Sequence, residues 1–271
     1  KITGSGEGKD AVFIRAGNRA ERDPLFISAQ RTGHLYGKTY VGGYQGVHSE
    51  QELLHFFRLA EEYYGSKPEK GKIFCDIGGN IGTTSVYVKK EFPALDVIAF
   101  EPNRENCRVF TINCILNDCE VDLRQTGLGR AAETAVLALS PDNMGNHRIW
   151  NSGVENRKTE NVRISTFDWE MKRNRGDIGY VWIDVEGYEG YVLEGMRKTL
   201  DRKKFPIWME FCPQMLEESG SMPVLRDMLH CYFRGYIDRH NIKRVCPVDE
   251  IDTLAESLKG GNATDLFLIR R

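Results

Sequence analysis

The residues of this chain that are best suited to chemistry begin with a glycine-rich turn. The segment 73–82 runs from an apolar stretch into that turn, and a helical stretch follows it. At the carboxyl edge of a parallel sheet, such a turn lacks side chains where a nucleotide would approach the backbone. Nineteen residues after Gly82, the apolar run 97–100 ends in Glu101, which is placed to accept hydrogen bonds from ribose hydroxyls. This order of strand, turn, helix, strand and acid predicts a nucleoside site.

The charge of the turn distinguishes between two cofactors. A dinucleotide needs unopposed backbone N–H groups for its pyrophosphate at the start of the helix, and Asp76 puts a negative charge nearby. S-adenosylmethionine (SAM) has no phosphate, and its cationic sulfonium and ammonium are attracted by a carboxylate. Thr83 follows Gly82, so the glycines also depart from the G-x-G-x-x-G pattern. These residues favour SAM; an NAD-dependent oxidoreductase and a turn without a ligand are the alternatives.

More acids lie at the end of a later apolar run. Asp184 and Glu186 alternate along an extended segment, Gly187 permits a turn, and Glu189 begins the next predicted helix. Carboxylates here can stabilise a sulfonium, accept a proton or hold a divalent cation. Burying an unpartnered acid costs on the order of several kcal/mol, which favours a functional or hydrogen-bonded role for Asp184. Glu189 is equally compatible with stabilising a helix N-terminus.

Two further residues are candidates to act on a methyl acceptor. His147 follows an apolar run in a loop-like stretch, and an unperturbed pKa of about 6.5 suits a general base. A solvated loop histidine is the alternative interpretation. Glu210 ends a predicted strand and is a candidate either to contact the acceptor or to form a structural ion pair.

Several other polar or aromatic groups have simpler interpretations. The two basic stretches consist of Lys172, Arg173 and Arg175 and of Arg202, Lys203 and Lys204. They would suit an anionic acceptor, but charged helix ends and loops are usually solvated, so we expect both to face water. Tyr40, Tyr44 and Trp150 are candidates to line a pocket, although packing in the core or on the surface is the safer interpretation.

A sheet whose strands end together would bring these residues to one place. Apolar runs alternate with helical stretches, and this rhythm predicts a parallel sheet with helices on both faces. The predicted strands are 72–76, 96–101, 121–126, 180–185 and 206–211, and the predicted helices are 49–64, 83–91, 104–116, 188–200 and 223–231. Runs at 232–238 and 265–269 would finish the sheet in antiparallel fashion. Runs at 135–139 and 162–164 predict an inserted hairpin or edge strands near the substrate.

Length and composition limit the remaining possibilities. The 271 residues, 41% hydrophobic and 28% charged, suit one catalytic domain at 49–271 after an N-terminal extension at 1–48, in which 36–48 is a candidate lid. The net charge of -2 argues against a nucleic-acid partner. No stretch approaches the roughly 20 apolar residues of a membrane span, so we expect no membrane partner and a cytoplasmic location. Seven cysteines without a C-x-x-C pair predict free thiols.

Four motifs resemble those of the FkbM family of SAM-dependent methyltransferases. They are the segments 76–82 (DIGGNIG), 100–102 (FEP), 165–168 (STFD) and 183–189 (IDVEGYE). The resemblance extends over most of residues 72–211, and the segment 193–195 (LEG) also fits the family pattern. The first two motifs are shared by many methyltransferases, whereas the last one is distinctive.

The resemblance implies a Rossmann-like class I SAM-dependent methyltransferase fold, an α/β fold with a mostly parallel seven-stranded sheet, and SAM as cofactor. Transferred by position, the cofactor-binding residues are Asp76, Gly78, Gly79, Asn80, Gly82, Glu101, Pro102, Asn103, Gly127, Leu128 and Asp184. The turn would surround the methionine part, Glu101 would hold the ribose, and the residues from Pro102 to Leu128 would flank the adenine. The catalytic candidates are Asp184, Glu186 and His147, and no metal ligand is predicted.

The expected reaction is in-line methyl transfer to an oxygen of a small molecule, sugar or natural product, with the acceptor atom about 3 Å from the methyl group. N- or C-methylation in the same pocket is an alternative, as is a SAM-binding protein without turnover. The residues after Ile183 lack the Asp/Asn-Pro-Pro-aromatic signature of enzymes that methylate amino groups of adenine or glutamine. The sequence leaves open the acceptor, the general base, assistance by a metal and the oligomeric state, for which a homodimer is one candidate.

Overall fold

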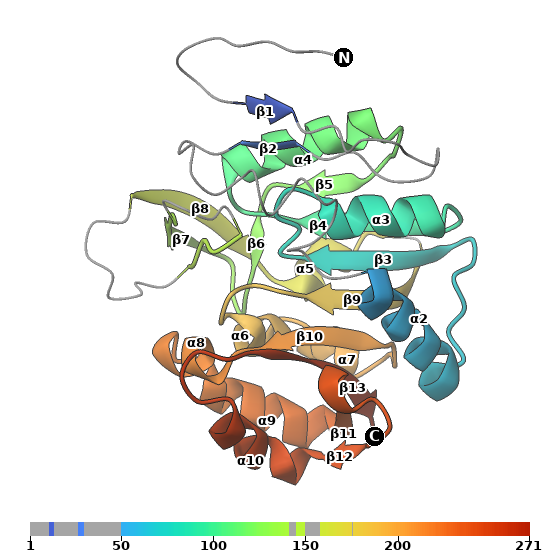
Figure 1. Cartoon of the computed structure of the whole chain (residues 1–271), viewed down its shortest axis with the longest axis vertical. Coiled ribbons are helices and arrows are strands. Elements are labelled where there is room, and N and C mark those ends of the chain that lie inside the picture. Colours follow the sequence, from blue (N-terminus) through green and yellow to red (C-terminus); the bar gives the residue numbers. More distant parts are fainter. Residues whose placement is uncertain (1–10, 14–26, 30–49, 141–144, 150–157, 175) are drawn as a thin grey trace.

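A mostly parallel sheet forms the centre of the molecule (Figure 1). The computed structural model describes residues 11–13, 27–29, 50–140, 145–149, 158–174 and 176–271. Within this part of the chain, eight strands pair in the order β12-β11-β13-β10-β9-β3-β4-β5. The strand β13 is antiparallel to both of its neighbours, and the two-residue strand β12 is antiparallel to β11. Without β12 the sheet has the seven strands that the sequence predicts, and the Rossmann-like class I methyltransferase fold is confirmed.

The strands of this sheet are β3 (Lys72–Ile77), β4 (Asp96–Phe100), β5 (Asp122–Arg124), β9 (Asp177–Ile183), β10 (Ile207–Phe211), β11 (Phe233–Asp238), β12 (Cys246–Pro247) and β13 (Thr264–Arg270). One face is covered by α2 (Glu50–Tyr64), α3 (Thr83–Glu91) and α4 (Arg104–Leu116). The other face carries α5 (Phe167–Met171), α6 (Glu189–Glu194), α7 (Arg197–Leu200), α8 (Pro213–Glu218), α9 (Met222–Tyr232) and α10 (Ile251–Ser257). Figure 1 shows α2 and α3 in front of the sheet and α6 and α7 behind it.

The central strands β9 and β10 are buried on both faces, which explains why they are mostly apolar. Side chains along β9 point alternately to the two faces, so that Trp182 faces α2 while Ile183 faces the opposite core. Trp182 stacks on Trp208 of β10 with ring centroids 5.4 Å apart. Phe56 of α2 packs against both indoles, at 5.8 and 6.0 Å. These aromatic contacts fix α2 across the sheet.

The helix predicted at 188–200 is divided in the structure. It forms α6 and α7, with an interruption at Gly195, whose carbonyl accepts the backbone N–H of Asp168 at 3.0 Å. The Asp168 carboxylate in turn accepts the backbone N–H groups of Lys198 and Thr199, each at 2.9 Å. A distant side chain thus caps α7, and the break depends on a tertiary contact that local periodicity does not reveal.

The predicted insertion forms a sheet of its own rather than edge strands of the large one. Its strands β6 (Gly127–Leu128), β7 (Glu133–Ala138) and β8 (Thr159–Ser165) pair in the order β6-β8-β7, with β7 and β8 antiparallel. Figure 1 shows this small sheet beyond the carboxyl ends of β3 and β9. It therefore adds a wall at the edge where the predicted site residues gather.

Some of the predictions concern residues that the structure does not describe. Of the predicted extension at 1–48, the structure describes β1 (Ala11–Phe13) and β2 (Ile27–Ala29), which pair antiparallel, so its role as a lid stays a prediction. Tyr40, Tyr44, Trp150 and Arg175 lie outside as well. The seven cysteines are free thiols, as predicted. None of the described helices has the length and apolarity needed to cross a bilayer.

Candidate active site

One cavity at the carboxyl ends of β3, β4 and β9 gathers most of the predicted site residues. Its lining includes Gly78, Asn80, Glu101, Pro102, Gly127, Leu128, His147, Asp184 and Glu186. The predicted residues Asp76, Gly79, Gly82 and Asn103 do not line it. The enclosed space is about 50 Å³, well below the roughly 300–1,000 Å³ of typical ligand sites. A bound nucleoside therefore needs more space than this cavity encloses.

Sequence reasoning missed other lining residues. They are Ile77, Phe100, Asn106, Leu137, Gly145, Ile149 and Val185. Ile77, Phe100 and Val185 adjoin motif residues at strand ends, so a nucleoside site at those ends already implied them. Leu137 and Ile149 come from the inserted small sheet and its connection, where an apolar residue carries no signal that distinguishes a pocket wall from a core position.

Glu101 follows β4 and connects three parts of the site. Its side chain is only 5% exposed, and its two carboxylate oxygens accept the backbone N–H groups of Asn80 at 2.9 Å and Asn103 at 2.8 Å. Burial raises the pKa of Glu101 to about 8, although these hydrogen bonds and the Asn106 amide oppose the shift. A carboxylate offers about four acceptor positions, so beside the two backbone donors and the Asn106 amide Glu101 can accept one ribose hydroxyl.

The turn after β3 depends on a glycine at position 78. Gly78 has a φ of +91°, and a Cβ atom there would lie 1.8 Å from the carbonyl oxygen of Asp184. The absence of a side chain thus lets the ends of β3 and β9 approach each other. Asn80 has a φ of +47°, and its buried side-chain oxygen has no hydrogen-bond partner among the residues that the structure describes. That oxygen is an acceptor at the wall of the cavity.

Three of the predicted cofactor-binding residues pack against the helices α3 and α4 and do not line the cavity. A Cβ atom at Gly79 or Gly82 would meet the ring of Phe110 within 3 Å, so both glycines allow α4 to pack closely. Asp76 is 1% exposed and accepts a hydrogen bond of 2.5 Å from the hydroxyl of Ser85 on α3. The structure therefore places the Asp76 side chain against α3 rather than in the cavity.

The turn after β9 carries the candidate catalytic acids. Glu186 has a φ of +55°, Gly187 follows with a φ of +99°, and Glu189 holds this strained turn. One oxygen of Glu189 accepts the N–H groups of Val185 at 3.1 Å and Gly187 at 3.2 Å. Burial raises the pKa of Glu189 to about 7. Glu189 is 1% exposed and does not line the cavity, so its structural interpretation is the better one.

His147 lines the cavity in an orientation that does not suit a general base. Its Nδ1 accepts the backbone N–H of Ser140 at 3.0 Å, so the neutral imidazole carries its proton on Nε2. In this tautomer the Nε2 atom of the ring is a donor. The adjacent Arg148 lies 3.9 Å from Glu186, an ion pair that joins this segment to the turn after β9.

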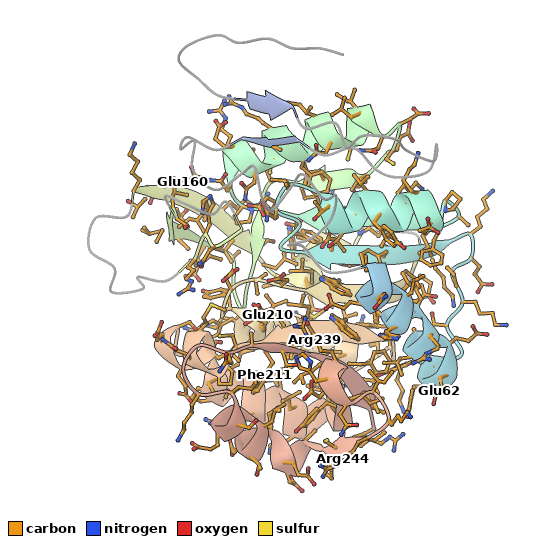
Figure 2. The ribbon with its side chains drawn as sticks, in the orientation of Figure 1. Glu62, Glu160, Glu210, Phe211, Arg239 and Arg244 are labelled. Carbon is orange, nitrogen blue, oxygen red and sulfur yellow. The ribbon has the colours of Figure 1, made fainter. Side chains whose placement is uncertain are left out.

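Glu210 ends up beside the candidate catalytic acids, although it does not line the cavity. Because Met209 of β10 pairs with Ile183 of β9, Glu210 is in register with Asp184 on the neighbouring strand. Its Oε2 atom is buried and has no hydrogen-bond partner in the described part of the chain. Burial, and then the nearby charge of Asp184, raise the pKa of Glu210 well above its usual range. Glu210 pairs across the sheet with Asp265 of β13, which forms an ion pair of 2.7 Å with Arg239; Glu210 and Arg239 are labelled in Figure 2.

The donors and acceptors of the cavity suit a cationic nucleoside such as SAM. Three acids, Glu101, Asp184 and Glu186, belong to the described lining, which contains no lysine or arginine, and Glu101 gains its negative charge as the pH rises toward 8. Such a lining repels the phosphates of a dinucleotide and attracts a sulfonium or an ammonium. The unpartnered oxygen of Asn80 supplies one more acceptor for the ammonium. The chemistry of the lining thus agrees with the cofactor that the sequence favours.

Known proteins similar to this chain share one activity in their names. A family profile described as the methyltransferase FkbM domain matches residues 76–237. Methyltransferase 1 of Beauveria bassiana (strain ARSEF 2860) is 28% identical over 169 residues, which cover 54% of this chain and 68% of that protein. Methyltransferase sdnD of Sordaria araneosa is 28% identical over 185 residues, 57% of this chain and 70% of that protein.

A solved structure extends the comparison to three dimensions. Methyltransferase FkbM from Methylobacillus flagellatus KT is 13% identical to this chain, with a TM-score of 0.43. The match covers 80% of this chain and 54% of the solved one, so this chain spans about half the length of that structure.

Proposed function

Because the chain belongs to the FkbM family of methyltransferases, we propose that it transfers the methyl group of SAM to an oxygen atom of a small molecule or sugar. The observation that carries this proposal is the acidic cavity at the ends of β3, β4 and β9, in which Glu101 keeps acceptor capacity for a ribose. When bound, SAM supplies an electrophilic methyl group. The protein must then hold the donor and the acceptor in line and exclude water.

The order of the strands divides the site into a cofactor side and an acceptor side. Glu101 follows β4, Gly78 follows β3, Asp184 follows β9, and Glu210 is in β10. Neighbouring strands lie about 4.8 Å apart, so Glu210 lies roughly 14 Å along the edge from Glu101. We assign the ribose to Glu101 and the ammonium or sulfonium to Asn80 and Asp184. The acceptor then lies over the ends of β9 and β10.

Glu210 is the residue that we assign to the acceptor hydroxyl. Oxygen methylation requires removal of a proton from that hydroxyl, and a carboxylate with a raised pKa is, once it is ionised, a stronger base than an ordinary one. The unpartnered Oε2 of Glu210 has the free acceptor capacity for this proton. Asp184 and Glu186 remain candidates for the same task, whereas the Nδ1 bond of His147 argues against the imidazole.

Methyl transfer from isotopically labelled SAM tests both parts of the proposal. The chain is incubated with SAM that carries a ¹³C methyl group and a panel of hydroxylated, amino and carbon-nucleophile acceptors. The carbon chemical shift of the product methyl group distinguishes O-, N- and C-methylation. We expect an O-methyl product. A product methylated on nitrogen or carbon contradicts the acceptor assignment.

The cofactor assignment has a separate readout. SAM and S-adenosylhomocysteine should raise the melting temperature of the protein, and NAD should not, because only a ligand that binds the folded state stabilises it. Glu101→Gln keeps the size of the side chain but removes the charge, so it should lose this stabilisation. If NAD stabilises the protein and SAM does not, the proposed cofactor is wrong.

A further inference from the structure

A second cavity lies at the opposite edge of the large sheet. It measures about 590 Å³, and the buried side chains Met171 of α5 and Ile178 of β9 form part of its lining. Ile178 is near the start of β9, whereas Asp184 follows the end of that strand. Six residues at about 3.3 Å each separate the two positions, so this cavity lies roughly 20 Å from the candidate active site. Its volume is within the range of sites for small ligands.

The two basic stretches of the sequence meet at this cavity. The described residues of both stretches are exposed, as the sequence predicts. Lys172 from the first stretch and Arg202 and Lys203 from the second line the same space, together with Lys198. Lys203 forms an ion pair of 2.7 Å with Asp177. Lys172, Lys198 and Arg202 form no ion pair with any residue that the structure describes. Three unpaired cations therefore surround one cavity in a chain whose net charge is -2.

The one acid in the described lining offsets only one of the four positive charges there. Asp168 accepts the backbone N–H groups of Lys198 and Thr199 and the hydroxyl of Thr199, at 2.6 to 2.9 Å. Its oxygens are thus committed to capping α7. The electrostatic field of the cavity stays positive, which favours an anion.

Trp169 adds a flat apolar surface to the positive charge. It lines the cavity, is 62% exposed, and has the Lys172 ammonium 5.7 Å from its ring centroid. An exposed indole of this kind is suited to stacking against a ring. Lysine and arginine side chains are in turn well suited to phosphate.

We propose that this cavity is a second ligand site, which binds a small molecule that combines a phosphate group with a planar ring. The phosphate is bound by Lys198 and Arg202, and the ring stacks on Trp169. The guanidinium group of arginine donates two parallel N–H hydrogen bonds that match the spacing of phosphate oxygens. Any of the nucleobases can stack on an aromatic side chain. This assignment does not depend on the methyl donor or acceptor.

Calorimetric titration of adenosine 5′-monophosphate (AMP) into the full chain tests the site. Saturating S-adenosylhomocysteine is present, so that the nucleoside pocket of the active site is filled. We expect AMP to bind, and the double variant Lys198→Gln/Arg202→Gln to weaken binding at least about tenfold. The matched control Lys90→Gln/Lys243→Gln removes two exposed charges elsewhere and should leave binding unchanged. Trp169→Leu should reduce the affinity for AMP to that for inorganic phosphate.

Three outcomes would overturn the proposal. The first is a wild-type chain that does not bind AMP. The second is AMP binding that persists in Lys198→Gln/Arg202→Gln, which would place the nucleotide elsewhere, including the active site. The third is a wild-type chain that binds inorganic phosphate as tightly as AMP, which would exclude the ring. Melting curves of all variants confirm that each one folds.

Discussion

The buried carboxyl group of Glu101 makes nucleoside binding depend on pH. Burial raises its pKa to about 8, and a ribose hydroxyl donates its hydrogen bond best to the ionised form. At neutral pH most Glu101 side chains in the free protein are protonated. Affinity for the nucleoside should therefore increase as the pH rises toward 8.

The size of the effect follows from the fraction of ionised Glu101. If only the ionised form binds, the apparent dissociation constant exceeds its limit by about 300-fold at pH 5.5 and about fourfold at pH 7.5. The expected gain in affinity over this interval is thus about 80-fold, or about 2.6 kcal/mol. The stability of the unliganded protein should change in the opposite direction. A folded pKa above the ordinary 4.5 means that Glu101 contributes a loss of stability as the pH rises from 4.5 to 8.

Calorimetry with 5′-methylthioadenosine isolates this contribution. That compound is the nucleoside half of SAM without its amino acid, so the ammonium of SAM does not titrate in the same experiment. Glu101→Gln should bind weakly at every pH in the interval. Glu189→Gln is the matched control: its pKa is raised to about 7, but Glu189 does not line the cavity, so this variant should keep the wild-type pH dependence.

If the affinity of the wild-type protein for 5′-methylthioadenosine does not change with pH, the assignment of the ribose to Glu101 is refuted. A pH dependence that survives in Glu101→Gln would show that another group titrates, and its loss in Glu189→Gln would identify that group.

Two substitutions at the same sheet edge give further predictions. Gly78→Ala should lose about 3 kcal/mol or more of unfolding free energy in urea, because its Cβ would lie 1.8 Å from the Asp184 carbonyl oxygen. Gly71 also has a positive φ but has open space around it, so Gly71→Ala should lose only about 1 kcal/mol. Equal losses would contradict the packing argument. Glu210→Gln should lower the rate of methyl transfer by about 100-fold and leave the affinity for SAM unchanged, because it removes the proposed base. It should also raise the melting temperature at pH 8, because it removes a buried acid with a raised pKa. Unchanged transfer would exclude Glu210 as the base.

Local signals were sufficient for the long helices. The helix 104–116 has the predicted bounds because Asn103 caps it, its side chain accepting the N–H of Asn106 at 2.8 Å. The helix predicted at 188–200 is divided because Asp168, distant in sequence, caps α7. The helices 167–171, 213–218 and 251–257 are too short for periodicity to indicate them.

The candidate site was predictable where its residues follow strands. Parallel strands end at one edge, so the sequence alone places Glu101 and Asp184 together. Asp76 differs because it lies within β3, where alternation directs its side chain to one face of the sheet, here toward Ser85 of α3. The orientation of His147 depends on the Ser140 N–H, a contact across a loop that no pattern in the sequence encodes.

Three acids with raised pKa values lie along one edge of the sheet, Glu101 after β4, Glu189 after β9 and Glu210 in β10. Each is buried, so each lowers the stability of the unliganded protein once it ionises. Burial of the aromatic side chains around Trp182 and Trp208 stabilises the fold and offsets this loss of stability. The packing of that core does not depend on these acids. A cationic ligand would relieve the repulsion among them, and its binding would then be strongest where the free protein is least stable. Glu189 holds the turn after β9, so Glu101 and Glu210 are the two acids that the charge of a ligand explains better than the needs of the fold.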